Sequence, residues 1–392
     1  MGSSSFARGL PRLLLFFISL FTSCTLLLDP PLSLGSPRAE DHRRGSPSGA
    51  LAGGGRDTLM LVSAVCFPES YDWQRDSAYG NVACTLRLFR GKQDVLGIPA
   101  GPGTTVSASP DGHHIIDGEL YTVYSDAGGT CIGRGGNPLA HWAEREYITG
   151  LLPSGGDVYT LGADDGGGLV FRCNGREFFK DPGGIPFGGF GSDTYGPGGA
   201  LYLDGGAVCF AYLRGGSETV FVRDGEQDGP PIAPKATNIL DARYIDGSKY
   251  VLYNHSGKTM LYENGSCRTV KGFTFTDAGL VKLDGRIFCA GNCTGTENDS
   301  EYYAAWNPRI SFIFHGRPDR LYQDGVTFVS LYLDEYPACR FFGKSCGKAF
   351  DGSIAVALTP RDGSAPFVSY KGARTEYPVH GFLSGVDFFI QE

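Results

Sequence analysis

One pattern recurs six times along this sequence of 392 residues: an apolar strand, an Asp-Gly or Gly-Gly turn, and a second apolar strand. The six turns begin at Asp117, Gly155, Asp204, Asp246, Asp284 and Asp324, so the pattern returns every 38 to 49 residues. Such a recurrence indicates small structural units that bury their apolar faces against one another. The composition agrees, because 59 Gly, 20 Tyr and 26 Phe suit short strands joined by tight turns.

A second turn follows the first in several units, which indicates four strands per unit. Asn174-Gly175, Asp224-Gly225 and Asn264-Gly265 each come after a further apolar strand pattern. Asn-Gly and Asp-Gly supply the positive φ angles that a two-residue type I′ hairpin turn requires. Each unit is therefore predicted to consist of two β-hairpins in one antiparallel sheet.

The length of the unit favours an all-β fold, the β-propeller, whose blades repeat at about this spacing. Radial packing around a central axis would bury both faces of every sheet. Strand-like sequence also remains at the two ends, at residues 59–98 and at residues 353–358, 367–370 and 386–390. If these two ends share one sheet, the ring closes with seven blades. Six and eight blades are alternatives to that count, and a parallel β-solenoid or a pair of β-sandwiches is the competing architecture.

The N-terminus is typical of an export signal. Two arginines precede an apolar core at residues 13–21, which is short for a membrane span. Residues 20–24, Leu-Phe-Thr-Ser-Cys, resemble the lipobox of bacterial lipoproteins, and this resemblance implies that Cys24 is lipidated. An ordinary signal peptide is one alternative. The other is an uncleaved anchor, since residues 26–28 prolong the apolar run.

These features divide the chain into three parts. Residues 1–24 are the signal peptide with its lipobox-like end, residues 25–57 are a flexible linker, and residues 58–392 are the β-propeller. The linker is rich in Pro, Gly and Ser and has too few apolar residues to offset the entropy of ordering. We therefore expect an exported protein of the cell envelope, anchored by lipid to a bacterial membrane.

Ten cysteines remain after Cys24, and an oxidising compartment would permit them to pair. Most lie in apolar strand patterns, where free cysteine behaves as a small buried hydrophobe. Only Cys289 with Cys293 and Cys339 with Cys346 are spaced like local disulfides. The sequence contains no cysteine and histidine spacing typical of zinc sites, so we expect neither a metal nor another cofactor.

Two histidine-containing groups carry chemistry that a site could use. His113 and His114 are adjacent on a predicted strand, so their side chains point to opposite faces, which favours a loop or capping role over a shared ion. His141 stands near Glu144 and Glu146 and could serve as a general base only with a second partner fixed in space. We interpret this second group as a polar loop.

Residues 124–131, Tyr-Ser-Asp-Ala-Gly-Gly-Thr-Cys, resemble the Asp-box of sialidase propellers. In that family the box ties a hairpin turn together and is not the catalytic site. The resemblance therefore implies a structural hairpin at these residues, as does their plain interpretation as a turn.

Tyr302, Tyr303 and Trp306 lie in the longest interruption of the repeat, between Cys293 and Ile310. We interpret this interruption as an inserted loop. Aromatic side chains in such loops can stack on sugar rings or anchor peptides, so these three are the candidate ligand-binding residues. Packing against a blade is the alternative.

The net charge and the sequence motifs limit the functions that this chain can have. The chain carries 34 Lys and Arg against 42 Asp and Glu, a formal net charge of -8, which does not favour a nucleic-acid partner. The candidate groups described above form no convergent catalytic set, so the first hypothesis is a non-catalytic binding or scaffolding module for protein or glycan. The alternative is a propeller-fold glycosidase, lyase or related hydrolase whose acidic residues line the central channel. Propellers host both classes, so the fold cannot choose between them.

Replacing Cys24 with Ser is expected to leave the protein folded and to release it from membranes. The reason is that lipidation, rather than an apolar helix, would hold the chain there. Partitioning of the wild-type and Cys24→Ser proteins into the detergent phase measures the effect. Retention of the variant in the membrane fraction would support the uncleaved anchor instead.

Overall fold

Antiparallel β-sheets make up nearly all the regular structure. The computed structural model describes residues 58–75, 82–101, 106, 112–187, 200–283, 285–294, 301–314, 320–324, 327–342 and 346–390. Within these residues the strands form eight sheets. The predicted signal peptide and linker, with Cys24, lie outside the described residues. No helix in the described part of the chain is long and apolar enough to cross a membrane.

The first four sheets follow the chain from its N-terminal strands. One contains β1 (Thr58–Cys66), β2 (Cys84–Arg90), β3 (Gln93–Ala100) and β32 (Gly381–Ile390). The next contains β4 (His113–Ile116), β5 (Glu119–Asp126), β6 (Gly129–Arg134) and β7 (Asn137–Trp142). The third contains β8 (Glu146–Ser154), β9 (Asp157–Asp164), β10 (Leu169–Cys173) and β11 (Arg176–Asp181). The fourth contains β12 (Gly184–Pro186), β13 (Tyr202–Asp204), β14 (Ala207–Arg214), β15 (Glu218–Arg223) and β16 (Glu226–Gln227).

The remaining four sheets continue in the same order. One contains β17 (Asn238–Ile245), β18 (Ser248–His255), β19 (Lys258–Glu263) and β20 (Ser266–Thr269). The next contains β21 (Thr274–Leu283), β22 (Arg286–Thr294), β23 (Glu301–Asn307) and β24 (Ile310–Ile313). A two-stranded sheet of β25 (Arg320–Gln323) and β26 (Phe328–Leu331) precedes a 3₁₀ turn, η4 (Leu333–Glu335). The last contains β27 (Cys339–Arg340), β28 (Gly347–Phe350), β29 (Ser353–Pro360), β30 (Phe367–Tyr370) and β31 (Ala373–Glu376).

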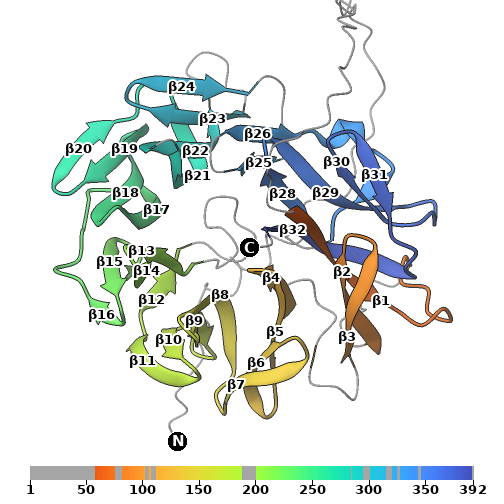
Figure 1. Ribbon diagram of the computed structural model, residues 1–392. Coiled ribbons are helices and arrows are strands. Elements are labelled where there is room, and N and C mark those ends of the chain that lie inside the picture. The colour runs from red at the N-terminus through yellow and green to blue at the C-terminus, as the bar shows by residue number, and fades with distance from the viewer. Residues whose placement is uncertain are drawn as a thin grey trace, which may run out of the picture. The chain divides into compact units, whose positions relative to one another are not determined.

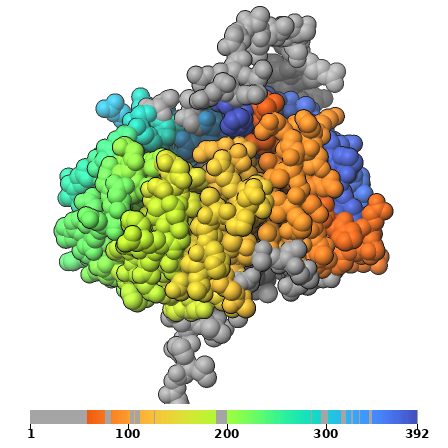
Figure 2. Space-filling view, turned by 60° about the horizontal axis from the view of Figure 1, so that its bottom comes forward, coloured from red at the N-terminus to blue at the C-terminus, as the bar shows by residue number. Residues whose placement is uncertain are grey.

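The sheets stand around a centre in chain order, with the first strand of most sheets innermost (Figure 1). Figure 2 shows the outer wall, on which successive sheets lie side by side and the C-terminal strands adjoin the N-terminal ones. Apolar clusters fill the space between neighbours: Leu252 and Leu261 of one sheet pack with Leu280 and Trp306 of the next. The predicted all-β, propeller-type architecture is therefore confirmed.

Pairing of the two ends of the folded region closes the ring. Strand β32 lies antiparallel to β1, in register from Thr58 opposite Ile390 to Cys66 opposite Gly381, with a bulge after Ser63. The C-terminal strand thus supplies the innermost position of a sheet whose other three strands come from the N-terminal side. The sequence predicted this closure from residues 386–390, which belong to β32.

The predicted turns are type I′ hairpins. Asp117 and Gly118, between β4 and β5, have φ angles of +49° and +81°, and Asn174 and Gly175, between β10 and β11, have φ angles of +50° and +80°. Two successive residues with positive φ match the right-handed twist of the strands they join. Each unit is therefore built from two hairpins, as the repeat indicated.

The aspartates of the inner turns also tie neighbouring sheets together. Asp204 Oδ2 accepts a hydrogen bond of 2.9 Å from the Gly247 amide in the inner turn of the next sheet. Asp246 forms an ion pair of 2.6 Å with Lys282 of the sheet that follows. Asp324 accepts in the same way from the Gly352 amide. Asp246 thus combines a positive φ of +53° with a contact to the next sheet. In the β13–β14 turn the positive φ angles belong to Gly205 and Gly206, and Asp204 makes only the contact.

In the outer turns, the side chain of the first turn residue accepts a hydrogen bond within its own sheet. Asn174 Oδ1 accepts from the Val158 amide at 2.9 Å, and Asp224 Oδ1 accepts from the Val208 amide at 2.8 Å. Asn264 Oδ1 accepts from the Lys249 amide at 3.0 Å. In each case the residue caps the strand that follows the inner turn. The Asn or Asp of the second turn is therefore explained by structure and is not available as a ligand.

The sequence led us to expect seven blades, whereas the described residues form eight sheets, one with only two strands. The unit that sequence analysis missed starts at Asp351-Gly352, the turn between β28 and β29, whose φ angles are +49° and +70°. This turn follows Asp324 by only 27 residues, less than any other interval. The short interval leaves room for just two strands, β25 and β26, in the preceding sheet.

Replacing Phe382 of β32 with Ala is expected to lower the free energy of unfolding by about 3–5 kcal/mol. This side chain is fully buried and stacks on Phe342 with ring centres 4.2 Å apart. Ile390→Ala on the same strand is the matched control, because Ile390 is 42% exposed and should change stability by less than about 0.5 kcal/mol. Urea unfolding followed by tryptophan fluorescence measures both.

Deletion of residues 381–392 tests closure itself. It should give a chain that aggregates or unfolds cooperatively, because the edge of β1 is then unpaired. A soluble deletion variant with a nearly normal melting curve would support the solenoid, in which each repeat contacts only its neighbours.

Candidate functional site

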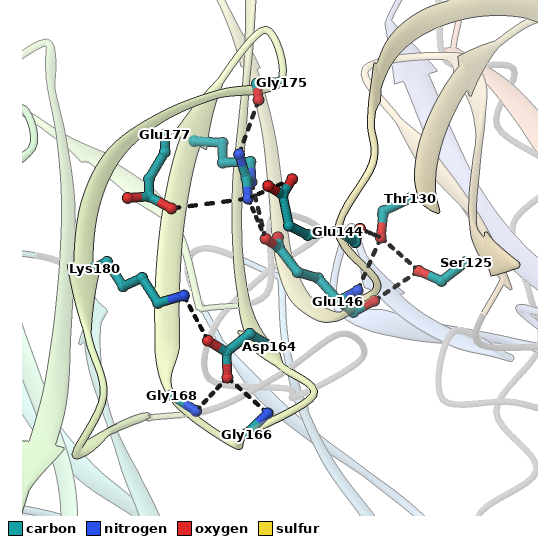
Figure 3. A network of polar contacts seen from close by, with 11 residues as sticks. Ser125, Thr130, Glu144, Glu146, Asp164, Gly166, Gly168, Gly175, Glu177 and Lys180 are labelled. Atoms are coloured by element: carbon teal, nitrogen blue, oxygen red, sulfur yellow. Dashed lines mark hydrogen bonds and ion pairs between the residues drawn. The ribbon is translucent and has the colours of Figure 1, made fainter. Parts of the chain in front are cut away.

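A buried cluster of charges lies at the start of β8 (Figure 3). Arg172 on β10 donates to Glu146 Oε1 through Nη2 at 2.6 Å and through Nε at 2.9 Å. The same guanidinium donates to the Gly175 carbonyl at 3.2 Å and lies 3.4 Å from Glu144. Side-chain exposure is 6% for Arg172 and 1% for Glu146. The pair is therefore desolvated and fixed in one geometry.

Burial dominates the electrostatics of Glu146. Desolvation raises its pKa, and the hydrogen bonds and charge of Arg172 oppose that rise without cancelling it. The second oxygen, Oε2, is buried and has no hydrogen-bond partner among the described residues. The same holds for the indole nitrogen of Trp142, over whose ring the Arg172 guanidinium lies at 5.1 Å. A buried acid with a raised pKa resembles a catalytic acid, so its surroundings decide its role.

Around Glu146, side chains of β5 and β6 form hydrogen bonds with the backbone that connects their sheet to β8. Thr130 Oγ1, on β6, donates to the Glu144 carbonyl at 2.8 Å and accepts from the Glu146 amide at 2.9 Å. Ser125 Oγ donates to the Glu146 carbonyl at 2.8 Å and lies 2.8 Å from Thr130 Oγ1 (Figure 3). The Asp-box-like segment therefore forms the predicted structural hairpin, between β5 and β6.

The same arrangement of hydrogen bonds occurs at a second junction between sheets. Asn254 and Thr259 flank the β18–β19 hairpin with the spacing of Ser125 and Thr130. Asn254 Nδ2 donates to the Phe275 carbonyl at 2.9 Å, and the Phe275 amide donates to Thr259 Oγ1 at 2.8 Å. Because the arrangement recurs without any acid like Glu146, we assign the network around Glu146 to the joining of sheets.

An open pocket offers a better candidate for function. It has a volume of about 290 Å³ and lies where the β17–β20 sheet meets the β21–β24 sheet. Three arginines line it, Arg268 on β20, Arg286 at the start of β22 and Arg309 between β23 and β24. We call this the Arg pocket. All three arginines are exposed, so the pocket is open to solvent.

Hydrogen bonds position two walls of the Arg pocket. Tyr250 Oη donates to Glu263 Oε1 at 2.8 Å, and the other oxygen of Glu263 pairs with Arg268. On the opposite wall, Asn307 Nδ2 donates to the Ile287 carbonyl at 2.6 Å, while Asn307 Oδ1 accepts from the Arg309 amide at 3.1 Å. The hairpin that carries Arg309 is thereby fixed to β22.

A second, smaller basic pocket of about 180 Å³ lies beside Trp73. Arg75, Arg340 and Arg361 line it. Arg75 forms an exposed ion pair of 3.3 Å with Asp72. Phe342 and Pro360 contribute apolar walls. The smaller volume makes this pocket the weaker candidate.

The three aromatic residues singled out from the sequence lie on β23, so the prediction of an inserted loop at these residues is wrong. Trp306 is buried between sheets with 6% exposure, and Tyr302 contacts Phe273 with ring centres 6.3 Å apart. Tyr303 is half-buried. The strand pairs with β22, which explains the packing of Trp306 in the core. A ligand-binding role for Tyr302, Tyr303 and Trp306 stays a prediction.

The histidines lie in separate places. His113 and His114 are both buried on β4, because neighbouring sheets cover both faces of an inner strand. His113 Nε2 lies 2.5 Å from Ser384 Oγ on β32, which adds a polar contact across the ring closure. His141 lies 3.1 Å from the Gly128 carbonyl, whereas Glu146 is paired with Arg172. The structure therefore does not make His141 and Glu146 a pair.

All ten cysteines of the described chain are free thiols. Cys289 and Cys293 lie on the same strand, β22, and Cys346 donates to the Phe342 carbonyl, so neither locally spaced pair forms a disulfide. Burial raises the pKa of Cys84, Cys209 and Cys293 to about 12. These thiols are protonated at neutral pH and are packing groups. Among the described residues no group of three His, Cys, Asp or Glu side chains could hold a metal ion.

Sequence reasoning missed the arginines of both sites. Arg172 interrupts the apolar run of β10, and a charge at such a position signals a buried partner. The Arg pocket also left a signal, because each of its arginines stands within a few residues of a turn: Asn264-Gly265, Asp284-Gly285 and Asn307-Pro308. In a sheet of two hairpins these turns lie at the same end, so their positions in the sequence could have indicated that the arginines approach one another.

Comparisons with known proteins identify no family for this chain. No family model and no curated protein matches the sequence. Similar solved structures include apo AztD from Citrobacter koseri, at 12% identity and a TM-score of 0.41 over 84% of this chain and 97% of that one. TolB from Acinetobacter baumannii has 10% identity and a TM-score of 0.35 over 84% and 82%, and the fission yeast SREBP–SCAP binding domains have 9% and 0.37 over 88% and 98%. Such low TM-scores and identities support no argument about the fold or the function of this chain.

Replacing Arg172 with Met is expected to lower the free energy of unfolding by about 3–5 kcal/mol, because Glu146 would stay buried without its counter-charge. The double variant Glu146→Gln/Arg172→Met should recover part of this loss. Arg87→Met is the control, since Arg87 and Asp94 form a pair whose side chains are 44% and 38% exposed and should contribute at most about 1 kcal/mol. Equal losses in Arg172→Met and Arg87→Met, measured by urea unfolding, would contradict the role given to the buried pair.

Proposed function

We propose that this chain is an envelope-anchored β-propeller that acts as a non-catalytic binding or scaffolding module for protein or glycan. The observation that carries the proposal is the Arg pocket, a solvent-open concavity between two sheets with hydrogen-bonded walls. Concave sites with a few fixed polar groups are where proteins bind small ligands and the ends of larger ones.

The N-terminal part of the proposal concerns location. A lipid on Cys24 would anchor the chain, and residues 25–57, rich in Pro, Gly and Ser, would hold the folded domain off the membrane. The ring begins at Thr58, directly after this segment. A tethered binding module can reach ligands near the membrane while its anchor prevents loss from the cell.

We also propose that the ring has eight blades, with β25 and β26 as a reduced one. Seven inner turns, including Asp351-Gly352, each start a sheet, and the β1–β32 pairing supplies the eighth. Strand β25 contacts β28, and β26 contacts β29, so the two-stranded sheet packs against its neighbour as the others do.

The alternative function is a glycosidase, lyase or related hydrolase with channel-lining acids. Three buried carboxylates of the innermost strands are engaged within the fold. Glu146 pairs with Arg172, and Asp387 pairs with Lys348 at 3.0 Å. Asp241 accepts from the Ala242 and Leu280 amides at 2.7 Å each, while burial raises its pKa to about 6. Groups committed in this way favour the binding module over a pair of catalytic acids.

The full-length protein in detergent micelles, applied to an array of neutral and acidic glycans, tests the proposal. Specific retention without new reducing ends or unsaturated sugars in the eluate is the expected result. Appearance of either product, above that of a heat-denatured sample, would establish the hydrolase or lyase alternative instead.

A further inference from the structure

The Arg pocket has an excess of positive charge that the fold does not neutralise. Arg268 is paired with Glu263. Arg286 and Arg309, which line the same pocket, form no ion pair within the described residues. Two uncompensated guanidinium groups thus face one concavity in a protein whose formal net charge is -8.

We propose that the Arg pocket binds the oxyanion of an acidic sugar, either a uronic acid carboxylate or a sulfate or phosphate ester. This inference rests on the proposed function, because it names the class of ligand that the binding module takes. Planar guanidinium groups donate two parallel hydrogen bonds to carboxylate, sulfate and phosphate oxygens, which makes arginine the residue of choice for such groups.

The pocket is organised before the ligand arrives. Glu263, held by Tyr250, orients Arg268 on one wall, and Asn307 fixes the backbone of Arg309 on the other. Arg286 follows Gly285, where an added side-chain carbon would have no heavy atom of the described residues within 4 Å. Donors that are already in place lose less entropy when they bind an anion.

The size and the remaining lining favour a sugar unit over an extended chain. A volume of about 290 Å³ lies at the low end of the range for small-ligand pockets. Leu261 and Ile287 give the pocket an apolar portion, while the Asn307 and Tyr250 side chains contribute polar edges. A hexose ring has apolar carbon faces and polar rims, so it matches this mixed lining while its acidic group contacts the arginines.

If these exposed arginines served only solubility, they would not need to line a pocket, and hydrogen bonds would not need to hold the walls of that pocket in place. Arg145 and Arg176 show the ordinary case, because both are exposed and line neither pocket described here. They therefore provide a matched control in which the same number of positive charges is removed from another part of the ring.

Isothermal titration of the full-length protein in micelles with glucuronate, inorganic sulfate, inorganic phosphate, glucose and an acidic hexapeptide tests the proposal. We expect saturable binding of one glucuronate per chain, weaker binding of the inorganic anions and none of glucose. Arg286→Gln and Arg309→Gln should each weaken glucuronate binding about tenfold or more, and the double variant about a hundredfold. Added salt should weaken binding further.

Arg145→Gln/Arg176→Gln, which makes the same change in net charge, should bind glucuronate like the wild type. The pocket variants should keep the wild-type melting temperature, because Arg286 and Arg309 are exposed and form no ion pair in the described chain. If the Gln variants have a lowered melting temperature, the Arg286→Lys/Arg309→Lys variant replaces them in the test. It keeps the positive charge and should bind glucuronate more tightly than the double Gln variant.

Three results would overturn the inference: no binding of glucuronate or of the inorganic anions, equal binding by the Arg286→Gln/Arg309→Gln variant, or binding of the hexapeptide in place of glucuronate. After any of these results the proposed function would still stand, provided that the glycan array still retains the protein. Conversely, product formation on the array would remove the binding-module proposal, while titration with glucuronate would still report on the Arg pocket.

Discussion

Pairing between β1 and β32 is the interaction on which the rest of the structure depends. Each sheet has two apolar faces, and a row of such sheets would leave one face bare at each end. The β1–β32 ladder removes both ends at once, since it places Phe382, Leu383 and Val386 against Leu61 and Val65 in one core. The entropy of joining residues more than 300 positions apart grows only with the logarithm of the separation. Burial at the closure therefore outweighs it.

The repeated turn is the local device that makes such a ring possible. Glycine supplies the positive φ of the second turn residue, but in the β17–β18 turn the aspartate before it, Asp246, also contacts Lys282 of the neighbouring sheet. Asp204, which precedes the Gly205-Gly206 turn, contacts Gly247 of the next sheet. In the β8–β9 turn, Gly155 stands in the place of aspartate, and the tie through a side chain is lost there. The preference for Asp-Gly thus reflects packing between sheets as well as turn geometry.

The fold could be predicted from the sequence because its signals are local and repeated. A hairpin turn is encoded in two adjacent residues, and six copies at similar spacing were enough to indicate propeller blades. The seventh copy, Asp351-Gly352, was missed because it breaks the spacing. The strand β23 was mistaken for a loop because the sequence before it, at residues 295–300, lacks the Asp-Gly or Asn-Gly pair. Local pattern therefore predicted the architecture better than it predicted the number of sheets.

The candidate site is non-local, and this is why sequence patterns alone did not locate it. The Arg172–Glu146 pair joins residues 26 positions apart, and the Arg pocket collects side chains from residues 250 to 309 on two sheets. The net charge of -8 also misleads, because much of the acidic charge sits on turns, where Asp204 and Asp246 are paired within the ring. Charges farther than about 8–10 Å are screened at physiological salt. Among the described residues that line the Arg pocket, the charged ones are three arginines and Glu263, so an acidic protein presents a basic surface at this junction.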